Sequence, residues 1–172
     1  MTDAFPDDSP DALVRLHGAL VFRVAYRVLG DRAQAEDVQQ DVFLRLIEAP
    51  PQDVQSWPAY LTAAANRRAI DQLRQVRRWW QLLPQWRAQA PSAAPSAEQA
   101  GIEHQRARRL RAALATLSAR EAQCFTLRYL QDQEIGEIAL ALGLSTNNVN
   151  VSLHRARRRM EAQLGETTET TP

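Results

Sequence analysis

Apolar residues recur along this chain at intervals of three and four positions, the spacing that places side chains on one face of an α-helix. No segment alternates apolar and polar residues as a half-buried strand does. The first helix is expected to begin with Ser9 as N-cap and Pro10 at the first helical position, and to end at Gly30. Its apolar stripe consists of Leu13, Leu16, Leu20 and Val24. The pattern predicts an all-α protein.

Two more helices are expected in the first half of the chain. Asp31 precedes one of them as N-cap, with Gln34 in the capping-box position, and Pro50 ends it. Its apolar face consists of Val38, Val42, Phe43, Leu46 and Ile47. The other runs from Pro58 to near Trp80, with one face that packs and another that is cationic. The packing stripe is Leu61, Ala65, Ala69, Leu73, Val76 and Trp80.

The chain is expected to form two small helical domains joined by a flexible linker. Residues 9–80 form the first domain, an N-terminal helical bundle. Residues 81–104 contain several prolines among Ala, Ser and Gln and show almost no periodicity, which is typical of a linker. Residues 105–165 form the second domain, and residues 166–172 are expected to be a disordered tail.

The second domain contains the pattern of a helix-turn-helix. Ser118 and Glu121 have the spacing of a capping box that opens one helix. Between 134 and 164, two apolar stripes flank a turn in which Gly143 suits a positive φ and Ser145 suits an N-cap. The small Ala139 allows the two helices to cross closely, as a helix-turn-helix requires.

The second helix of this motif would enter the major groove of DNA with its first exposed residues. Asparagine can pair bidentately with adenine, and the basic residues that follow can lie near phosphates. The candidate DNA-contacting residues are Ser145, Thr146, Asn147, Asn148, Asn150, Val151, His154, Arg155 and Arg158. The asparagines also suit a helix start and the arginines a solvated helix end, so this alternative stays open.

Composition adds a charge pattern that the total conceals. The 172 residues have a formal net charge of +1, and every basic side chain other than histidine is arginine. Residues 1–53 hold ten acids and five arginines, whereas residues 54–90 hold six arginines and one aspartate. A bias toward arginine in the genome does not sort charges into blocks, so the segregation indicates separate acidic and basic surfaces.

Several classes of protein are excluded or disfavoured. No stretch approaches the length of an apolar membrane span, and the acidic N-terminus is unlike a secretory signal. Cys124 is the single cysteine, so an intrachain disulfide is excluded and a cytoplasmic location is expected. The three histidines lie far apart without cysteine partners, so neither a metal nor another cofactor is expected. An enzyme is disfavoured because no phosphate loop or nucleophile–base arrangement is present.

Three stretches resemble those of the extracytoplasmic-function sigma factors, the small two-domain bacterial transcription initiation factors. Residues 35–47, Ala-Glu-Asp-Val-Gln-Gln-Asp-Val-Phe-Leu-Arg-Leu-Ile, are similar to the polymerase-binding helix of that family. Tyr60-Leu61 through Asp71 and Arg74 resemble its −10 helix. Residues 110–164, with Leu-Arg-Tyr at 127–129 and Leu-His-Arg-Ala-Arg at 153–157, resemble its −35-reading domain.

The resemblance implies a function and a set of sites. A member of this family binds core RNA polymerase at the clamp hairpin and the flap, opens −10 DNA, binds the −35 element, and starts transcription of a stress- or signal-responsive regulon. It implies an anti-sigma partner and a monomer when free of partners, with no small-molecule substrate. The implied polymerase-binding residues are Glu36, Asp37, Gln40, Asp41 and Arg45. The implied −10 residues are Tyr60, Arg67, Arg68, Arg74, Arg77 and Arg78, with Trp57, Trp79 and Trp80 as further aromatic candidates. The resemblance also implies that the candidate DNA-contacting residues of the helix-turn-helix bind the −35 element.

This chain departs from the family pattern at several positions. Arg67 stands where the family usually has Asn, and Asn66 lies one residue earlier. Asn150 and Val151 replace a usual basic–Ser pair in the recognition helix. These differences predict promoter preferences unlike those of the better-known members.

Two alternatives remain open on the sequence. A sigma-like decoy would keep the two-domain shape in order to titrate an anti-sigma factor, and the reduced basic charge of the recognition helix is its only support. A helix-turn-helix repressor would form a stable homodimer on a palindrome. The repressor hypothesis leaves the acidic second helix and the basic third helix without a purpose.

Overall fold

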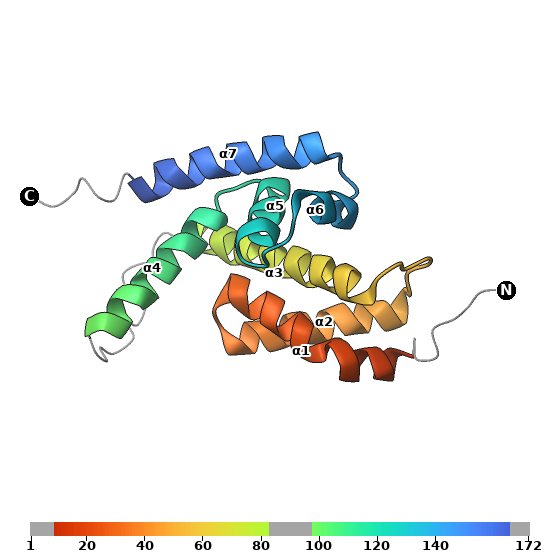
Figure 1. Ribbon diagram of the computed structural model, residues 1–172. Coiled ribbons are helices and arrows are strands. Elements are labelled where there is room, and N and C mark those ends of the chain that lie inside the picture. The colour runs from red at the N-terminus through yellow and green to blue at the C-terminus, as the bar shows by residue number, and fades with distance from the viewer. Residues whose placement is uncertain (1–8, 83–97, 166–172) are drawn as a thin grey trace, which may run out of the picture.

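The computed structural model describes residues 9–82 and 98–165, and within them it contains seven helices and no strand (Figure 1). This confirms the all-α prediction. The expected tail at 166–172 and the side chain of Trp80 lie outside the described part. The helices are α1 (Pro10–Leu29), α2 (Arg32–Glu48), α3 (Trp57–Leu82), α4 (Glu98–Leu114), α5 (Ala119–Tyr129), α6 (Ile135–Leu142) and α7 (Thr146–Gly165).

The predicted caps define several helix ends. The Ser9 side chain accepts a hydrogen bond from the Ala12 amide at 3.3 Å, and Asp31 accepts one from the Gln34 amide at 2.9 Å. Gly30 ends α1 with a φ of 67°, a conformation that favours glycine. A Cβ at that position would also meet the guanidinium of Arg111, so any other residue would have to displace that side chain as well.

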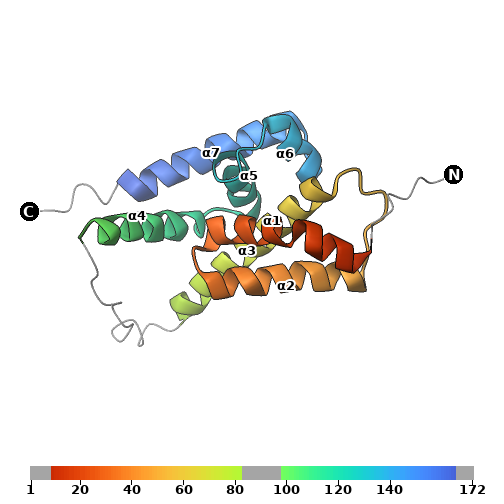
Figure 2. The same cartoon turned by 60° about the horizontal axis from the view of Figure 1, so that its bottom comes forward.

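The helices α1, α2 and α3 form the N-terminal module (Figure 2). Its core includes Leu13, Val24, Val38 and Leu61 of the expected stripes, together with Val21 and Val28, which the expected stripe of the first helix left out. Three apolar residues of those stripes are not packed, since Leu16 is 64%, Ile47 57% and Val76 41% exposed. At 100° per residue Ile47 lies beyond Phe43 at the edge of the α2 stripe, where no helix of the described chain covers it.

The helix α4 begins inside the segment that composition assigns to the linker. Residues 98–104 are helical because the chain after the last proline of that segment carries Glu, Gln and Ala, which favour helix. The helix α3 likewise continues to Leu82. The rest of the expected linker, residues 83–97, is outside the described part of the chain.

The C-terminal module consists of α4 to α7. The helix-turn-helix has its own core, in which Cys124, Leu127, Ile138 and Val149 are fully buried. The end of α4 and one side of α5, by contrast, share a single core with the N-terminal module, and α3 lies against α5 and α6 (Figure 1). The two modules are therefore in direct contact, which the sequence pattern did not predict.

Candidate polymerase and nucleic-acid interfaces

One face of α2 is acidic and open to solvent. Asp37 and Gln40 are exposed, and Asp41, one helical turn after Asp37, is half-buried beside them. Glu36 lies at the edge of this face, where the Arg32 guanidinium is 2.8 Å from its carboxylate. We refer to Asp37, Gln40 and Asp41 as the acidic face. It contains two of the three carboxylates that the sequence assigned to polymerase binding, and Gln40; the third carboxylate, that of Glu36, is paired with Arg32.

Asp41 is the most constrained member of the acidic face. The same carboxylate oxygen lies 2.9 Å from Nε of Arg45 and 2.7 Å from Nε of Arg68. Asp37 and Asp41 also line, with Arg68 of α3, a shallow hollow of about 470 Å³ between α2 and α3. Arg68 was assigned to −10 DNA from the sequence, but here it pairs with Asp41 of the acidic face.

Two apolar side chains extend the acidic face toward the end of α2. Leu44 is 54% exposed, and Ile47 is also exposed, at three and six positions beyond Asp41. Exposed large apolar side chains next to charged ones are typical of a surface that meets another protein. The apolar spacing of α2 did not mark Leu44 and placed Ile47 in the core, because helical periodicity alone cannot mark the edge of a stripe.

The cationic face of α3 carries a stripe made of Tyr60, Arg67, Arg74 and Arg78, which follow one another at spacings of seven, seven and four. Tyr60, Arg67 and Arg78 are exposed and Arg74 is half-buried. Tyr60 meets Trp57 edge to face, with ring centroids 5.9 Å apart. We call these four residues the α3 stripe. Their guanidinium groups and one aromatic ring are suited to a nucleic-acid strand.

Two predicted −10 residues do not belong to this stripe. Arg68 points toward α2, where it pairs with Asp41. Arg77 donates a hydrogen bond from Nη1 to the carbonyl oxygen of Ala115 in the C-terminal module, at 3.0 Å. Both guanidinium groups are thus engaged within the protein. The six predicted −10 residues therefore divide into the four of the α3 stripe and these two arginines.

Part of the α3 stripe also faces the helix-turn-helix. Tyr60 and Arg67 line a groove of about 550 Å³ whose opposite wall is α6, with Glu137 and Leu140. Leu140 is 84% exposed even though it belongs to the apolar α6. We call this the inter-module groove. It shows that the first turns of α3 and the C-terminal module lie close together.

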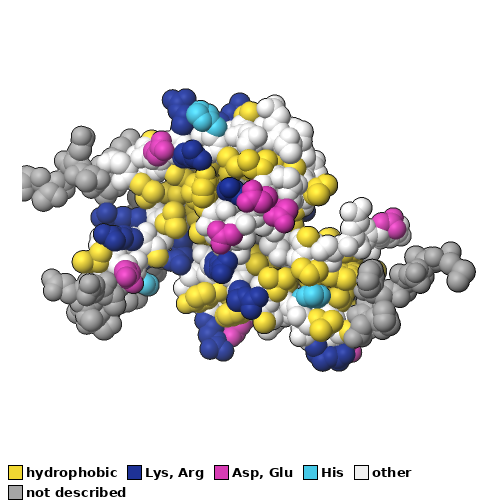
Figure 3. Space-filling view, viewed as in Figure 1, with side chains coloured by type: hydrophobic (Ala, Val, Ile, Leu, Met, Phe, Trp, Pro, Cys, Tyr) yellow, Lys and Arg dark blue, Asp and Glu magenta, His cyan; other side chains and the backbone are white. Residues whose placement is uncertain are grey.

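The helix-turn-helix has the geometry that the sequence predicts. Gly143 ends α6 with a φ of 63°, and Ser145 caps α7 by accepting a hydrogen bond from the Asn148 amide at 3.2 Å. The exposed residues that follow are Thr146, Asn147, Asn148, Asn150, Val151, His154, Arg155 and Arg158. In the space-filling view of Figure 3, basic side chains and a histidine gather along the upper edge of the molecule, over α7. This side of α7 is exposed to solvent.

Two other arginines of α7 have structural partners instead. Arg159 lies 2.7 Å from the carboxylate of Glu121, which is only 7% exposed and also accepts the Ser118 amide in the capping box. Arg157 donates a hydrogen bond to the Tyr129 hydroxyl, which raises the pKa of Arg157. Both side chains tie α7 to α5 and hold the recognition helix in place.

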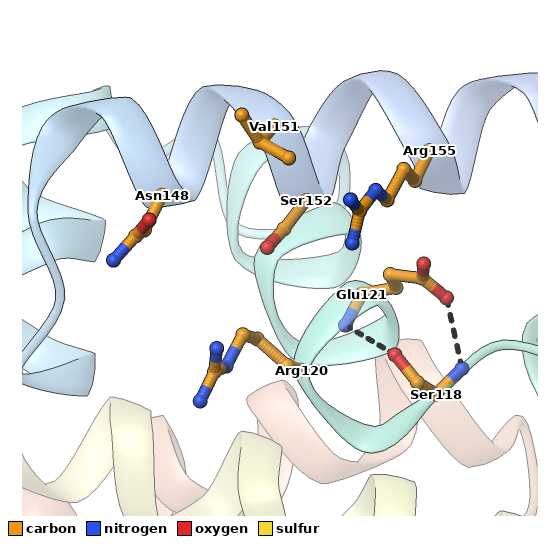
Figure 4. A pocket seen from close by; sticks show the side chains of 7 residues that line it. All are labelled: Ser118, Arg120, Glu121, Asn148, Val151, Ser152 and Arg155. Carbon is orange, nitrogen blue, oxygen red and sulfur yellow. Dashed lines mark hydrogen bonds between the residues drawn. The ribbon is translucent and has the colours of Figure 1, made fainter.

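A hollow of about 450 Å³ joins the start of α5 to the open side of α7 (Figure 4). From α7 it is lined by Asn148, Val151 and Arg155, and from α5 by Arg120. Arg120 therefore adds an exposed positive charge beside the predicted −35 residues. Arg120 was not among the predicted residues, because it follows the capping Ser118 in a different helix and only the fold brings the two helices together.

Cys124 is fully buried in the helix-turn-helix core. Burial raises the pKa of its thiol, against weaker opposite contributions from a hydrogen bond with Ser152 and from the charge of Arg120. Within residues 9–82 and 98–165, no group of three or more potential metal ligands comes together. The helices of that part of the chain include none that is both long and apolar enough to cross a membrane.

Comparison with known proteins gives the family. The family model of Sigma-70 region 2 matches residues 13–91, and that of Sigma-70 region 4 matches residues 107–160. ECF RNA polymerase sigma factor SigL of Mycobacterium tuberculosis is 31% identical over 168 residues, covering 90% of this chain and 88% of SigL. The chain belongs to the ECF RNA polymerase sigma factors.

Other relatives agree with this assignment but differ in length. SigE of Mycolicibacterium smegmatis is 26% identical and covers 91% of this chain, but the chain spans only 62% of SigE. Among solved structures, the sigma factor RpoE of Bartonella quintana, in complex with the anti-sigma factor NepR, aligns with a TM-score of 0.51 at 16% identity. That alignment covers 88% of this chain and 94% of RpoE, and it supports the fold.

Proposed function

We propose that this ECF sigma factor binds core RNA polymerase, directs it to promoters through their −10 and −35 elements, and opens the DNA for initiation. The observation that carries the proposal is the separation of three exposed surfaces along the chain. The acidic face lies on α2, the α3 stripe is cationic, and α7 presents asparagines followed by arginines. A single small chain that carries one surface for a basic protein and two for DNA is suited to join them.

The acidic face is the proposed polymerase contact. Asp37, Gln40 and Asp41 are suited to a basic helical hairpin such as that of the polymerase clamp, and Leu44 and Ile47 would add apolar contact area. Because Asp41 already pairs with Arg45 and Arg68, the fully open charge on this face is that of Asp37.

The α3 stripe is the proposed −10 contact. Arg67, Arg74 and Arg78 would follow the backbone of the non-template strand, and Tyr60 offers a ring on which a base can stack. Arg68 and Arg77 would join them only after leaving their present partners.

The recognition helix α7 is the proposed −35 contact. Asn147, Asn148 and Asn150 would reach base edges, while Arg155 and Arg158 would lie near phosphates, with Arg120 from α5 beside them. Val151 offers an apolar contact to a thymine methyl group.

An anti-sigma factor is the proposed regulatory partner. The support is the complex of RpoE with NepR, a relative in fold, together with the inter-module groove, which presents the exposed Leu140 between α3 and α6.

Run-off transcription with core polymerase on a promoter library tests the proposal. We expect the protein to start transcription from a defined subset of promoters that share −10 and −35 sequences. Equal binding of promoter DNA with and without polymerase, together with a homodimer in light scattering, would instead indicate a dimeric repressor. Failure to initiate with otherwise active polymerase, combined with tight binding of an anti-sigma factor, would indicate a decoy.

A further inference from the structure

The C-terminal module packs directly on the helix that carries the proposed −10 surface. Leu114, Leu117 and Ala122 belong to the same buried core as Leu61 and Ile70 of α3. The helix α3 contacts both α5 and α6 of the C-terminal module (Figure 2). The interface between the modules is therefore apolar and continuous with the core of the N-terminal module.

A polar pair lies inside this apolar interface. Asn66, near the middle of α3, has no exposed surface, and Thr126 of α5 has none either. The Thr126 hydroxyl donates to Oδ1 of Asn66 at 2.7 Å, with the carbonyl oxygen of Ala122 in its own helix as a second acceptor at 2.8 Å, and Nδ2 of Asn66 donates to the carbonyl oxygen of Gln123 at 3.3 Å. A buried amide satisfied across an interface fixes one register of packing, because any shift leaves it unpaired.

Three arginines reinforce the same arrangement at its edges. Arg27 of α1 donates to the carbonyl oxygen of Leu130 at 2.8 Å, and Arg111 of α4 donates to that of Val28 at 3.3 Å. Arg77 of α3 donates to the carbonyl oxygen of Ala115. Arg77, a predicted −10 residue, is therefore bonded to the C-terminal module in this arrangement and does not point to the α3 stripe.

The closed arrangement is too short for a promoter. Elements centred near −10 and −35 are separated by about 25 base pairs, which is roughly 85 Å of duplex at 3.4 Å per base pair. A compact chain of this length has a radius of gyration of about 16 Å. The two modules can therefore reach both elements only after they separate.

We propose that the closed arrangement is an autoinhibited resting form of the free protein, latched by Asn66 and Thr126, and that it opens when core polymerase binds. The proposal rests on the proposed function, because only simultaneous binding of the −10 and −35 elements requires the modules to separate. In the closed form Arg77 is occupied, and Tyr60 and Arg67 face α6 across the inter-module groove.

The latch has a quantitative consequence for binding. If only the open fraction is competent, the apparent dissociation constant is the intrinsic one divided by that fraction. Weakening the latch should therefore strengthen binding to polymerase and to single-stranded DNA by the same factor. A contact that stabilises only one module would not change the affinities for polymerase and for single-stranded DNA by the same factor.

The test uses Thr126→Val in the full chain. Valine keeps the shape of threonine but leaves Oδ1 of Asn66 without its hydroxyl donor in the closed form, whereas water can satisfy Asn66 in the open form. We expect the ratio of closed to open protein to fall by about 5- to 100-fold, the range for an unsatisfied buried polar group. The matched control is Thr116→Val, since the Thr116 hydroxyl donates to Ala113 within its own module.

The measurements are the radius of gyration by small-angle X-ray scattering, and affinities for core polymerase and for a short labelled single strand of mixed sequence. We expect Thr126→Val to increase the radius and both affinities, and Thr116→Val to match the unaltered protein. Helical content by circular dichroism checks that each variant is folded. An unaltered protein that is already extended, or a folded Thr126→Val with unchanged radius and affinities, would overturn the proposal.

A second pair of variants keeps the test decisive if Thr126→Val fails to fold. Arg27→Ala removes the bond to Leu130 from an exposed side chain, and Arg23→Ala, one turn earlier on α1, removes an equally exposed arginine that has no partner within residues 9–82 and 98–165. Only Arg27→Ala should raise both affinities, and an equal effect of the two variants would contradict the latch. Failure of the unaltered protein to initiate on any promoter, with the latch variants still expanding it, would refute the proposed function alone.

Discussion

Nε of Arg68 on α3 lies 2.7 Å from the carboxylate of Asp41 on α2, so the helix proposed for −10 DNA is joined by an ion pair to the helix proposed for polymerase. Asp41 also pairs with Arg45 at 2.9 Å. A basic polymerase surface that binds Asp41 would compete with Arg68 for the same carboxylate. Polymerase docking would then release a guanidinium toward the promoter strand.

The strength of this pair can be measured with a double-mutant cycle. We expect Arg68→Ala and Asp41→Ala to show a coupling of about 0.2–1 kcal/mol in the free energy of unfolding, because both side chains remain partly exposed. Urea unfolding at low and high salt is the measurement, and the coupling should weaken with salt. Additive effects of the two substitutions at low salt would show that the ion pair contributes nothing to stability.

Charge reversal of the acidic face should remove polymerase binding. Asp37→Arg combined with Asp41→Arg places two cations where a basic partner surface would dock, and we expect holoenzyme assembly to be lost. Asp37→Arg alone should act in the same direction, because Asp37 forms no ion pair within the described chain. Gel-filtration or fluorescence anisotropy with core polymerase is the measurement.

The control for this prediction carries the same change in net charge elsewhere. Asp11→Arg with Glu103→Arg alters two exposed acids on α1 and α4, outside the acidic face. This variant should assemble with polymerase as the unaltered protein does. Assembly of the Asp37 and Asp41 double variant at full affinity would refute the docking assignment.

Helix positions and caps were predictable because they depend on local chemistry. Ser9, Gly30 and the Ser118–Glu121 capping box all act where the sequence places them, since a cap needs only residues within one turn. The helix-turn-helix was equally visible, because its close crossing requires a small residue and a glycine at fixed offsets.

The contact between the modules was not predictable from the same patterns. Asn66 reads as a polar residue within a cationic helix, and Thr126 as one polar position in a short helix, so nothing local indicates that they meet. Leu44 and Ile47 show the converse case: they are apolar, yet they stay exposed at the edge of the α2 stripe, where a partner protein could cover them. Long-range packing decides both cases, and periodicity carries no information about it.

Two adjacent arginines of α7 should have different roles. Arg158 is exposed, and its replacement by alanine should reduce DNA affinity and lower the slope of log affinity against log salt by about one, with little effect on stability. Arg159 pairs with the buried Glu121, and Arg159→Ala should cost about 1 kcal/mol in the free energy of unfolding. Salt-dependent DNA binding of the holoenzyme and urea unfolding are the measurements. The reverse pattern would place Arg159 on the DNA.

Cys124 should be protected in the native protein. Its thiol is fully buried and burial raises its pKa, so a thiol reagent at neutral pH should react far more slowly than with the urea-unfolded chain. The raised pKa contributes stability that is present below the ordinary thiol pKa of about 8.5 and is lost as pH rises through the native value. Cys124→Ser should flatten the alkaline end of the stability profile. Rapid native labelling would contradict the burial.

Asn148 is the most direct test of −35 recognition. Its backbone amide is held by Ser145, and its exposed side chain at the start of α7 lines the same hollow as Arg120 and Arg155 (Figure 4). Asn148→Ala removes the amide while keeping the cap, so we expect initiation from a −35-dependent promoter to fall by about 5- to 100-fold, the value of one bidentate base contact. A promoter lacking that element should be unaffected, because the substitution leaves polymerase and −10 contacts intact. Gln105→Ala, an exposed amide on α4, is the matched control and should change neither promoter. Equal loss on both promoters would mean that Asn148 acts through folding or polymerase contact and not through base recognition.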